Sequence, residues 1–169
     1  MSIDNKATLF LKAEVKASNG KFKLNDCMCG DIELADAKGV VGGGSKAHFS
    51  TGSVYGIFVV ETDKGKMSKL FEEVGNEVES IDQAGTIYPI YWGKDIHPGS
   101  RILAHARHNP GTGNAELEKI KALRDLNLIY GCVYVTTYDK FEQHLHTTYK
   151  PLLGTSGSGK KTIWSIVDK

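Results

Sequence analysis

The chain has 169 residues, the size of one ordinary domain that can bury its own core. Hydrophobic residues make up 40% of the sequence and charged residues 24%, which excludes an intrinsically disordered chain, and no apolar run is long enough to span a bilayer. The net charge of +1 is low for a nucleic-acid-binding protein, so any site for DNA would have to depend on local basic residues.

The amino-terminal segment and the cysteines indicate the compartment. Residues 1–6 are polar, and no apolar segment shaped like a signal peptide is present. Cys27 and Cys29 are separated by one residue rather than by the two residues of a zinc knuckle, and with Cys132 the cysteines are odd in number. We therefore expect a cytoplasmic protein without a membrane segment, and disfavour disulfides and structural zinc.

The first predicted elements precede a clear strand. Residues 7–16 alternate between apolar and polar and predict a strand, while residues 19–46 mix glycine with charge and predict hairpins and loops. Residues 53–60 are rich in aromatic and branched side chains between turn residues, which predicts a further strand.

Two helices and a strand are predicted next. Residues 66–80 predict an amphipathic helix with apolar residues at helical spacing, namely Met67, Leu70, Phe71, Val74 and Val78. A strand follows over residues 86–93. Pro98 suits the first turn of a second helix, and Arg101 and His105 project from one face of that helix because they are four residues apart.

A helix and a strand are predicted again after residue 109. A break at residues 109–111 precedes another predicted amphipathic helix, with its apolar positions at Leu117, Ile120, Leu123 and Leu126. Residues 130–136 have strand composition. A loop over residues 154–159 and a short strand over residues 162–167 are predicted at the end.

The helix after residues 130–136 is predicted to carry two polar residues on one side. Thr137 or Asp139 can cap it, and its predicted buried stripe consists of Phe141, Leu145 and Tyr149. Glu142 and His146 are four residues apart, so they share a face beside the stripe.

The ordered set of these residues resembles the GIY-YIG nucleases. Ser53-Val54-Tyr55 corresponds to the first motif triplet, Tyr91-Trp92-Gly93 to the second, Arg101 and His105 to the helix that follows, and Glu142 to the last helix, before Tyr149-Lys150-Pro151. The predicted helical insertion over residues 66–80 resembles the restriction-endonuclease branch of this family. Taken singly, each residue is more often a strand aromatic or a solvated helix residue, so only the set is specific.

The resemblance implies an α+β fold, with a small central antiparallel three-stranded sheet flanked by helices. We expect a single domain over residues 1–169. Within it, residues 1–51 would form an amino-terminal β and loop extension, residues 52–154 the nuclease core, and residues 155–169 a flexible basic tail.

The resemblance also implies roles for individual residues. Glu142 would hold one divalent cation, Mg²⁺ or Mn²⁺, and Arg101 would bind the scissile phosphate through its planar guanidinium. Tyr55 would orient or deprotonate the attacking water, assisted by Tyr91 and His105. The residues expected to contact DNA are Lys94, Arg107, His108 and Lys150. The implied function is a type II restriction-like endonuclease that cleaves double-stranded DNA, as a homodimer or in two sequential events.

Three alternatives stay open at this point. A competing motif register uses Gly56-Ile57-Phe58, which lacks the tyrosine hydroxyl. Ser53 stands where glycine is usual, and the asparagine expected after Pro151 is missing, so the chain could instead be a catalytically inactive module that binds DNA or protein. A repair or mobile-element nuclease would share the chemistry and differ in its target.

Residues 154–162 nearly form a phosphate-binding P-loop, but Lys161 stands where serine or threonine is required, so we reject a P-loop here.

Overall fold

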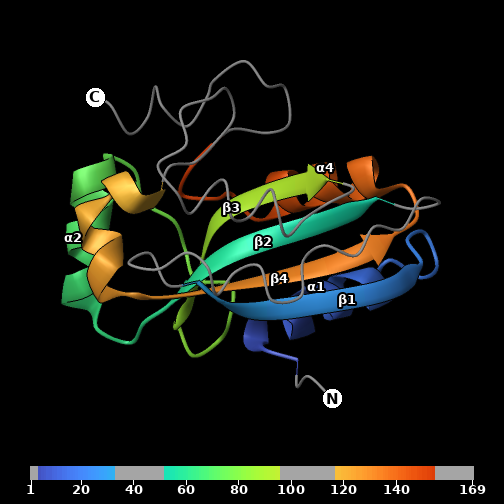
Figure 1. Cartoon of the computed structure of the whole chain (residues 1–169), viewed down its shortest axis with the longest axis horizontal. Coiled ribbons are helices and arrows are strands. Elements are labelled where there is room, and N and C mark those ends of the chain that lie inside the picture. The colour runs from blue at the N-terminus through green and yellow to red at the C-terminus, as the bar shows by residue number, and fades with distance from the viewer. Residues whose placement is uncertain (1–3, 33–51, 96–116, 155–169) are drawn as a thin grey trace.

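The computed structural model describes residues 4–32, 52–95 and 117–154, which form an α+β fold (Figure 1). In chain order the described elements are α1 (Lys6–Ala17), β1 (Leu24–Ile32), β2 (Ser53–Val60), α2 (Lys64–Val74), β3 (Ile87–Asp95), the 3-10 helices η2 (Leu117–Lys119) and η3 (Lys121–Asp125), β4 (Asn127–Val135) and α4 (Tyr138–Thr148). No helix in these three ranges is both long and apolar enough to cross a membrane.

The sheet has four antiparallel strands in the order β1-β4-β2-β3, so the predicted three-stranded sheet is one strand short. The additional strand, β1, pairs with β4 from Leu24 opposite Val135 to Ile32 opposite Leu128. It lies in the region predicted as hairpins and loops, and it was not predicted as a strand of the central sheet because its sequence, LNDCMCGDI, is polar and contains glycine. Such a composition is tolerated at the edge of a sheet, where one side of the strand has no neighbouring strand to pack against.

The strand predicted over residues 7–16 is wrong, because this segment forms α1. Asn5 caps the helix, since its side-chain oxygen accepts a hydrogen bond from the Thr8 backbone N–H at 3.0 Å. The Asn5 side-chain amide also donates to the Tyr130 carbonyl at 2.9 Å, which ties the start of α1 to β4. Ala7, Leu11 and Val15 are buried at four-residue spacing, so helical periodicity prevailed over the apparent alternation.

Two predicted helices have different bounds or a different type. Helix α2 ends at Val74 rather than at residue 80, because Gly75 adopts a left-handed conformation with φ of 76° that terminates it. The helix predicted from Leu117 is two short 3-10 helices, η2 and η3. Its four buried apolar residues recur every three positions, which is the repeat of a 3-10 helix rather than of an α-helix.

The remaining predictions are close to the observed elements. The strand predicted over residues 86–93 is β3, the one predicted over residues 130–136 is β4, and residues 53–60 form β2 as predicted. Thr137 precedes α4 as the cap residue, although its side chain makes no capping hydrogen bond. The predicted helix after Pro98, the end of the predicted hairpin region beyond residue 32, and the tail with its predicted strand over residues 162–167 lie outside the described residues.

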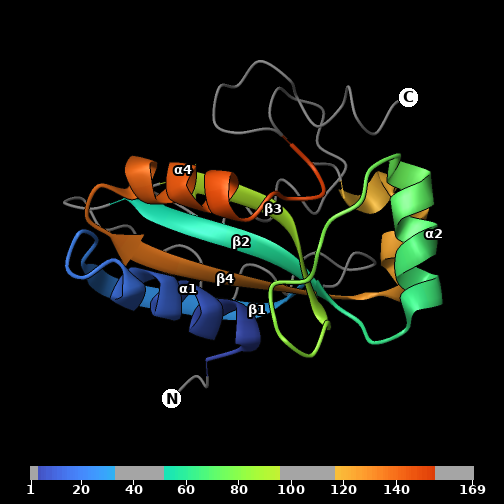
Figure 2. The ribbon, with the colours of Figure 1, turned by 180° about the vertical axis from the view of Figure 1, so that it is seen from behind.

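Helices α1 and α4 cover one face of the sheet, as the opposite views of Figures 1 and 2 show. Successive strand residues point to opposite faces, so β2 contributes Val54 and Phe58 to the face under these helices and Tyr55 and Ile57 to the other. We call these the helix face and the tyrosine face. Helix α2 lies with η3 at one end of the sheet, and its buried residues join the core of the tyrosine face.

Candidate functional site

The two motif tyrosines lie together on the tyrosine face. Tyr55 of β2 is almost fully buried, and its ring centroid is 6.2 Å from that of Tyr91 of β3. The Tyr55 ring packs over Gly93 so closely that a Cβ atom at position 93 would collide with the phenol. Glycine is therefore required at this position of the second motif for a steric reason.

Glu142 lies on α4 and therefore on the other face of the sheet. The neighbouring residues Phe141 and Leu145 pack into the core of the helix face, together with Trp92 of β3. The structure thus divides the predicted site: it brings Tyr55 and Tyr91 together, and it positions Glu142 on a helix that covers the opposite face.

The two flanks of α4 have different surroundings. On one flank, His144 lies 3.1 Å from the Glu14 carboxylate of α1. On the other flank, Glu142 and His146 lie toward β3, where the Lys94 ammonium acts electrostatically on both. Lys94 is exposed, and it follows Gly93 in the edge strand. Glu142 therefore lies near the β3 edge of the sheet.

Both polar residues of this flank are buried. Glu142 is 6% exposed and His146 is 9% exposed. Among the described residues, the His146 Nδ1 atom is fully buried and has no hydrogen-bond partner. The Glu142 carboxylate interacts electrostatically with the Lys94 ammonium. Buried polar groups in proteins are nearly always hydrogen-bonded, so the unpartnered Nδ1 atom of His146 requires an explanation.

Burial shifts the titration of both groups away from their charged forms. Burial raises the pKa of Glu142, the positive charge of Lys94 partly counteracts it, and Asp139 adds to the increase. Burial lowers the pKa of His146 and Lys94 lowers it further, whereas a hydrogen bond to the Trp92 backbone partly offsets both effects. His146 is therefore neutral at pH 7, with a ring nitrogen lone pair that can bind a proton or a metal ion.

The chemistry of this pair fits a divalent cation. The described residues contain no group of three or more histidine, cysteine, aspartate or glutamate side chains that could hold a metal ion. Mg²⁺ does not need such a group, because it binds through one or two carboxylates and fills its remaining positions with water and phosphate oxygens. Glu142 would be the protein carboxylate in such a site.

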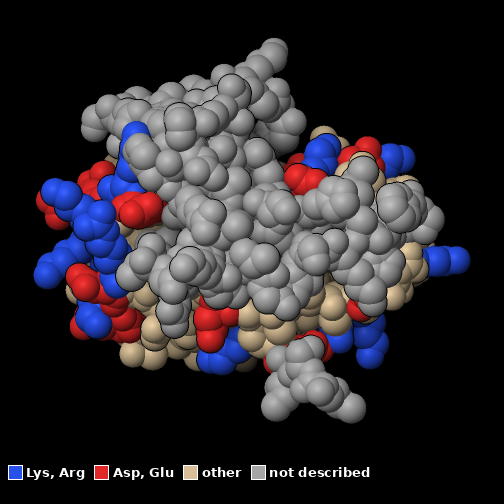
Figure 3. All heavy atoms as spheres, in the orientation of Figure 1, with Lys and Arg blue, Asp and Glu red and all other residues tan. Residues whose placement is uncertain are grey.

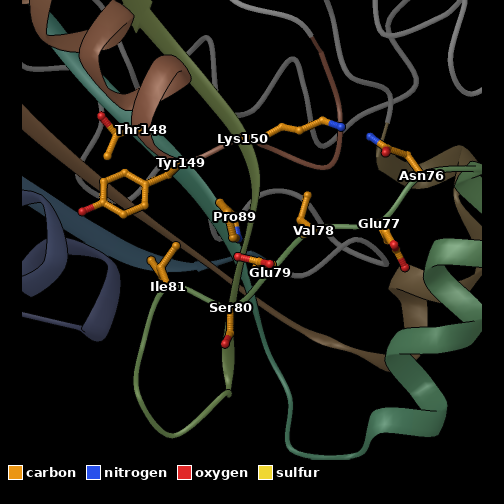
Figure 4. A pocket seen from close by; sticks show the side chains of 10 residues that line it. All are labelled: Asn76, Glu77, Val78, Glu79, Ser80, Ile81, Pro89, Thr148, Tyr149 and Lys150. Atoms are coloured by element: carbon orange, nitrogen blue, oxygen red, sulfur yellow. The ribbon is translucent and has the colours of Figure 1, made fainter.

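Lys150 lies away from this flank. It follows α4, about two helical turns beyond Glu142, and lines a pocket of about 870 Å³. The pocket lies between residues 76–81, Pro89 and the end of α4 (Figure 4). Glu77 and Glu79 also line it, so the surroundings of Lys150 are of mixed charge.

The other predicted site residues are Arg101, His105, Arg107 and His108, and they lie outside the described residues. Around α2, acidic and basic side chains are intermixed on the surface (Figure 3). A phosphate-binding role for the described part therefore depends on individual side chains such as Lys94.

Compared with known proteins, the chain matches no protein-family model, no curated protein and no solved structure. The resemblance to the GIY-YIG nucleases thus depends on the motif residues alone.

No functional role was predicted for His146 from the sequence. The four-residue spacing from Glu142 predicted a shared face. Its burial without a partner at Nδ1 could not be predicted, because it depends on how α4 packs against β3.

Proposed function

We propose that this protein is a metal-dependent endonuclease of the restriction type that hydrolyses phosphodiester bonds of double-stranded DNA. The observation that carries the proposal is Glu142, a carboxylate that is only 6% exposed and lies close enough to the Lys94 ammonium to interact with it electrostatically. Burying a carboxylate lowers stability, and a pKa raised by burial is typical of functional sites.

The order of elements supports the proposal. Strands β2 and β3 pair antiparallel, β4 pairs with β2 on its other side, and α4 follows β4 directly. The same sequence of elements is implied by the resemblance to the GIY-YIG nucleases, with the two tyrosines on paired strands and the glutamate on the last helix.

The edge of β3 is where one phosphate could contact both halves of the site. Gly93 has no side chain, Tyr55 lies over it on the tyrosine face, and Lys94 extends on the helix face beside Glu142. We infer that the scissile phosphate binds at this edge. Lys94 would hold it from the helix face, and the predicted role of Arg101 is to complete its binding.

Each group would have a separate chemical task. A divalent cation at Glu142 would supply positive charge for the leaving oxygen. The Tyr55 and Tyr91 hydroxyls would orient the attacking water by hydrogen bonding. The ammonium group of Lys94 would offset the negative charge of the phosphate.

Nicking of supercoiled plasmid in the presence of Mg²⁺ tests the proposal. We expect Glu142→Gln to lower the rate at least about 100-fold, because it removes the charge that holds the cation. Asp139→Asn is the matched control, since Asp139 is an exposed acid on the same helix, and it should nick at nearly the wild-type rate. Equal nicking by wild type and Glu142→Gln, or no Mg²⁺-dependent nicking of a randomised duplex pool, would refute the proposal.

A second candidate function is a catalytically inactive module that binds DNA or protein. It is favoured by the position of the tyrosines and Glu142 on opposite faces of the sheet. This module would bind without cleaving. Steep loss of affinity with increasing salt would indicate DNA as the partner, whereas binding to a protein need not depend on salt in this way.

A further inference from the structure

We propose that Glu142 and His146 together form a metal site on α4, and that the imidazole makes this site prefer transition metal ions such as Mn²⁺ and Co²⁺ to Mg²⁺. The inference deepens the proposed function by naming a second ligand and the class of ion. It can nevertheless be tested without DNA.

The spacing on the helix suits a shared ion. Side chains four residues apart lie on one face with Cβ atoms about 5–6 Å apart. Both can therefore reach a common ion at the usual ligand distances of about 2.0–2.2 Å. Four-residue spacing on a helix is also the arrangement by which other helices present two metal ligands to one ion.

The burial of the pair is the second observation. His146 is more than nine-tenths buried and its Nδ1 atom has no hydrogen-bond partner in the described ranges, and Glu142 on the same flank is 6% exposed. A bound cation would satisfy both groups at once. Without a ligand, the burial of His146 Nδ1 carries a desolvation cost that no hydrogen bond offsets, and Lys94 offsets the cost of burying Glu142 only in part.

Strand β3 holds the end of the helix that carries His146. The Trp92 indole N–H donates to the Tyr149 carbonyl at 2.7 Å, which fixes the end of α4 against β3. His146 would thus be held in place before the ion binds.

The ligand types determine the class of ion. Mg²⁺ prefers oxygen ligands, whereas imidazole favours transition metals. A mixed site with one carboxylate and one imidazole therefore binds Mn²⁺ or Co²⁺ more tightly than Mg²⁺. Lys94 opposes any cation here, since its positive charge acts on both ligands.

Calorimetric titration of the DNA-free protein with Mn²⁺ and Mg²⁺ tests the site. We expect His146→Gln to weaken Mn²⁺ binding at least about 10-fold and Mg²⁺ binding much less, and Glu142→Gln to weaken both. Lys94→Gln should strengthen both. His144→Gln is the matched control, because His144 lies on the opposite flank of α4 beside Glu14, and it should leave both affinities unchanged.

Two outcomes would overturn the inference: equal Mn²⁺ affinity of wild type and His146→Gln, or wild-type affinity for Mn²⁺ no higher than for Mg²⁺. If His146→Gln does not fold, pulsed EPR of the Mn²⁺-loaded wild type provides the test. A nitrogen coupling that Glu142→Gln abolishes supports the site, and its absence overturns it. Failure of the nuclease proposal is separate, because it would appear as absent nicking with these metal affinities intact.

Discussion

Asp82 and Glu142 are both acidic residues in partly or fully buried positions, yet their surroundings differ completely. Asp82, in the turn before β3, accepts hydrogen bonds from the Thr86 N–H at 2.8 Å, the Thr86 hydroxyl at 2.6 Å and the Ile87 N–H at 2.9 Å. Burial raises the pKa of Asp82, but these bonds outweigh it, so the pKa lies below its usual value. Glu142 is buried without such bonds in the described ranges, and its pKa is raised.

The difference separates a structural carboxylate from one that folding alone does not explain. The hydrogen bonds of Asp82 hold the turn closed and orient the start of β3. Glu142 contributes no comparable bond, so its burial on the β3 flank of α4 is better explained by a ligand than by stability.

The largest expected change in the free energy of unfolding comes from removing the Asp82 carboxylate. Asp82→Ala leaves two backbone N–H groups and a hydroxyl without their acceptor. We expect it to lower the free energy of unfolding by about 1.5–3 kcal/mol, measured by urea denaturation. Glu77→Ala, at an exposed acid of the same connection, is the control and should change stability by less than about 0.5 kcal/mol. An equal loss in both variants would contradict the structural role of Asp82.

Glu142→Gln should change the free energy of unfolding in the opposite direction. Without added metal at neutral pH, we expect it to raise the free energy of unfolding by about 0.5–2 kcal/mol, because it removes a buried charge that Lys94 offsets only in part. The same urea experiment measures it, with Asp139→Asn expected to be neutral. A clear destabilisation by Glu142→Gln would show that the carboxylate stabilises the fold, and the comparison with Asp82 would fail.

The contribution of Asp82 should also depend on pH. Its pKa in the folded protein lies below the ordinary value of 3.8, so the unfolded chain takes up the proton first as the pH falls. The stability that Asp82 contributes is therefore present above pH 3.8 and is lost as the pH falls through the folded value. The deficit of Asp82→Ala should accordingly shrink between about pH 5 and pH 2 in urea titrations. A deficit that stays constant over this range would argue against the ionised carboxylate as its cause.

The smallest expected change in the free energy of unfolding comes from His144, on the flank of α4 that faces α1. His144 and Glu14 lie 3.1 Å apart, but the His144 side chain is 40% exposed, so solvent screens the pair. We expect His144→Gln to lower the free energy of unfolding by at most about 1 kcal/mol. Thermal denaturation in low and high salt would measure it, and a larger loss would mean that this flank too depends on a strong polar contact.

Local sequence patterns predicted part of the fold. The branched and aromatic residues of β2 and β4 predicted two neighbouring strands, since such side chains suit a half-buried pleated surface. The prediction was wrong for α1, because a single capping residue, Asn5, and contacts with β4 decided between helix and strand. The prediction of an α-helix from Leu117 was also wrong. An apolar residue at every third position matches the repeat of a 3-10 helix, and two short 3-10 helices are found there.

Local sequence patterns also predicted only part of the candidate site. Spacing predicted that Glu142 and His146 share a face, and the Tyr91-Trp92-Gly93 triplet predicted the strand position over which Tyr55 packs. The separation of Tyr55 and Glu142 by the sheet could not be predicted, since periodicity along one strand does not specify which face a later helix will cover.

Local sequence alone indicates which segments have the apolar pattern of a strand, which residues can cap a helix or form a turn, and which polar side chains lie one helical turn apart, because these properties depend on neighbours along the chain. Three features depend on packing between distant segments: α4 lies beside α1, β1 extends the sheet, and Glu142 and His146 become buried against β3. Burial and its effect on charge depend on residues distant in sequence, and these come together only when the sheet and its helices pack.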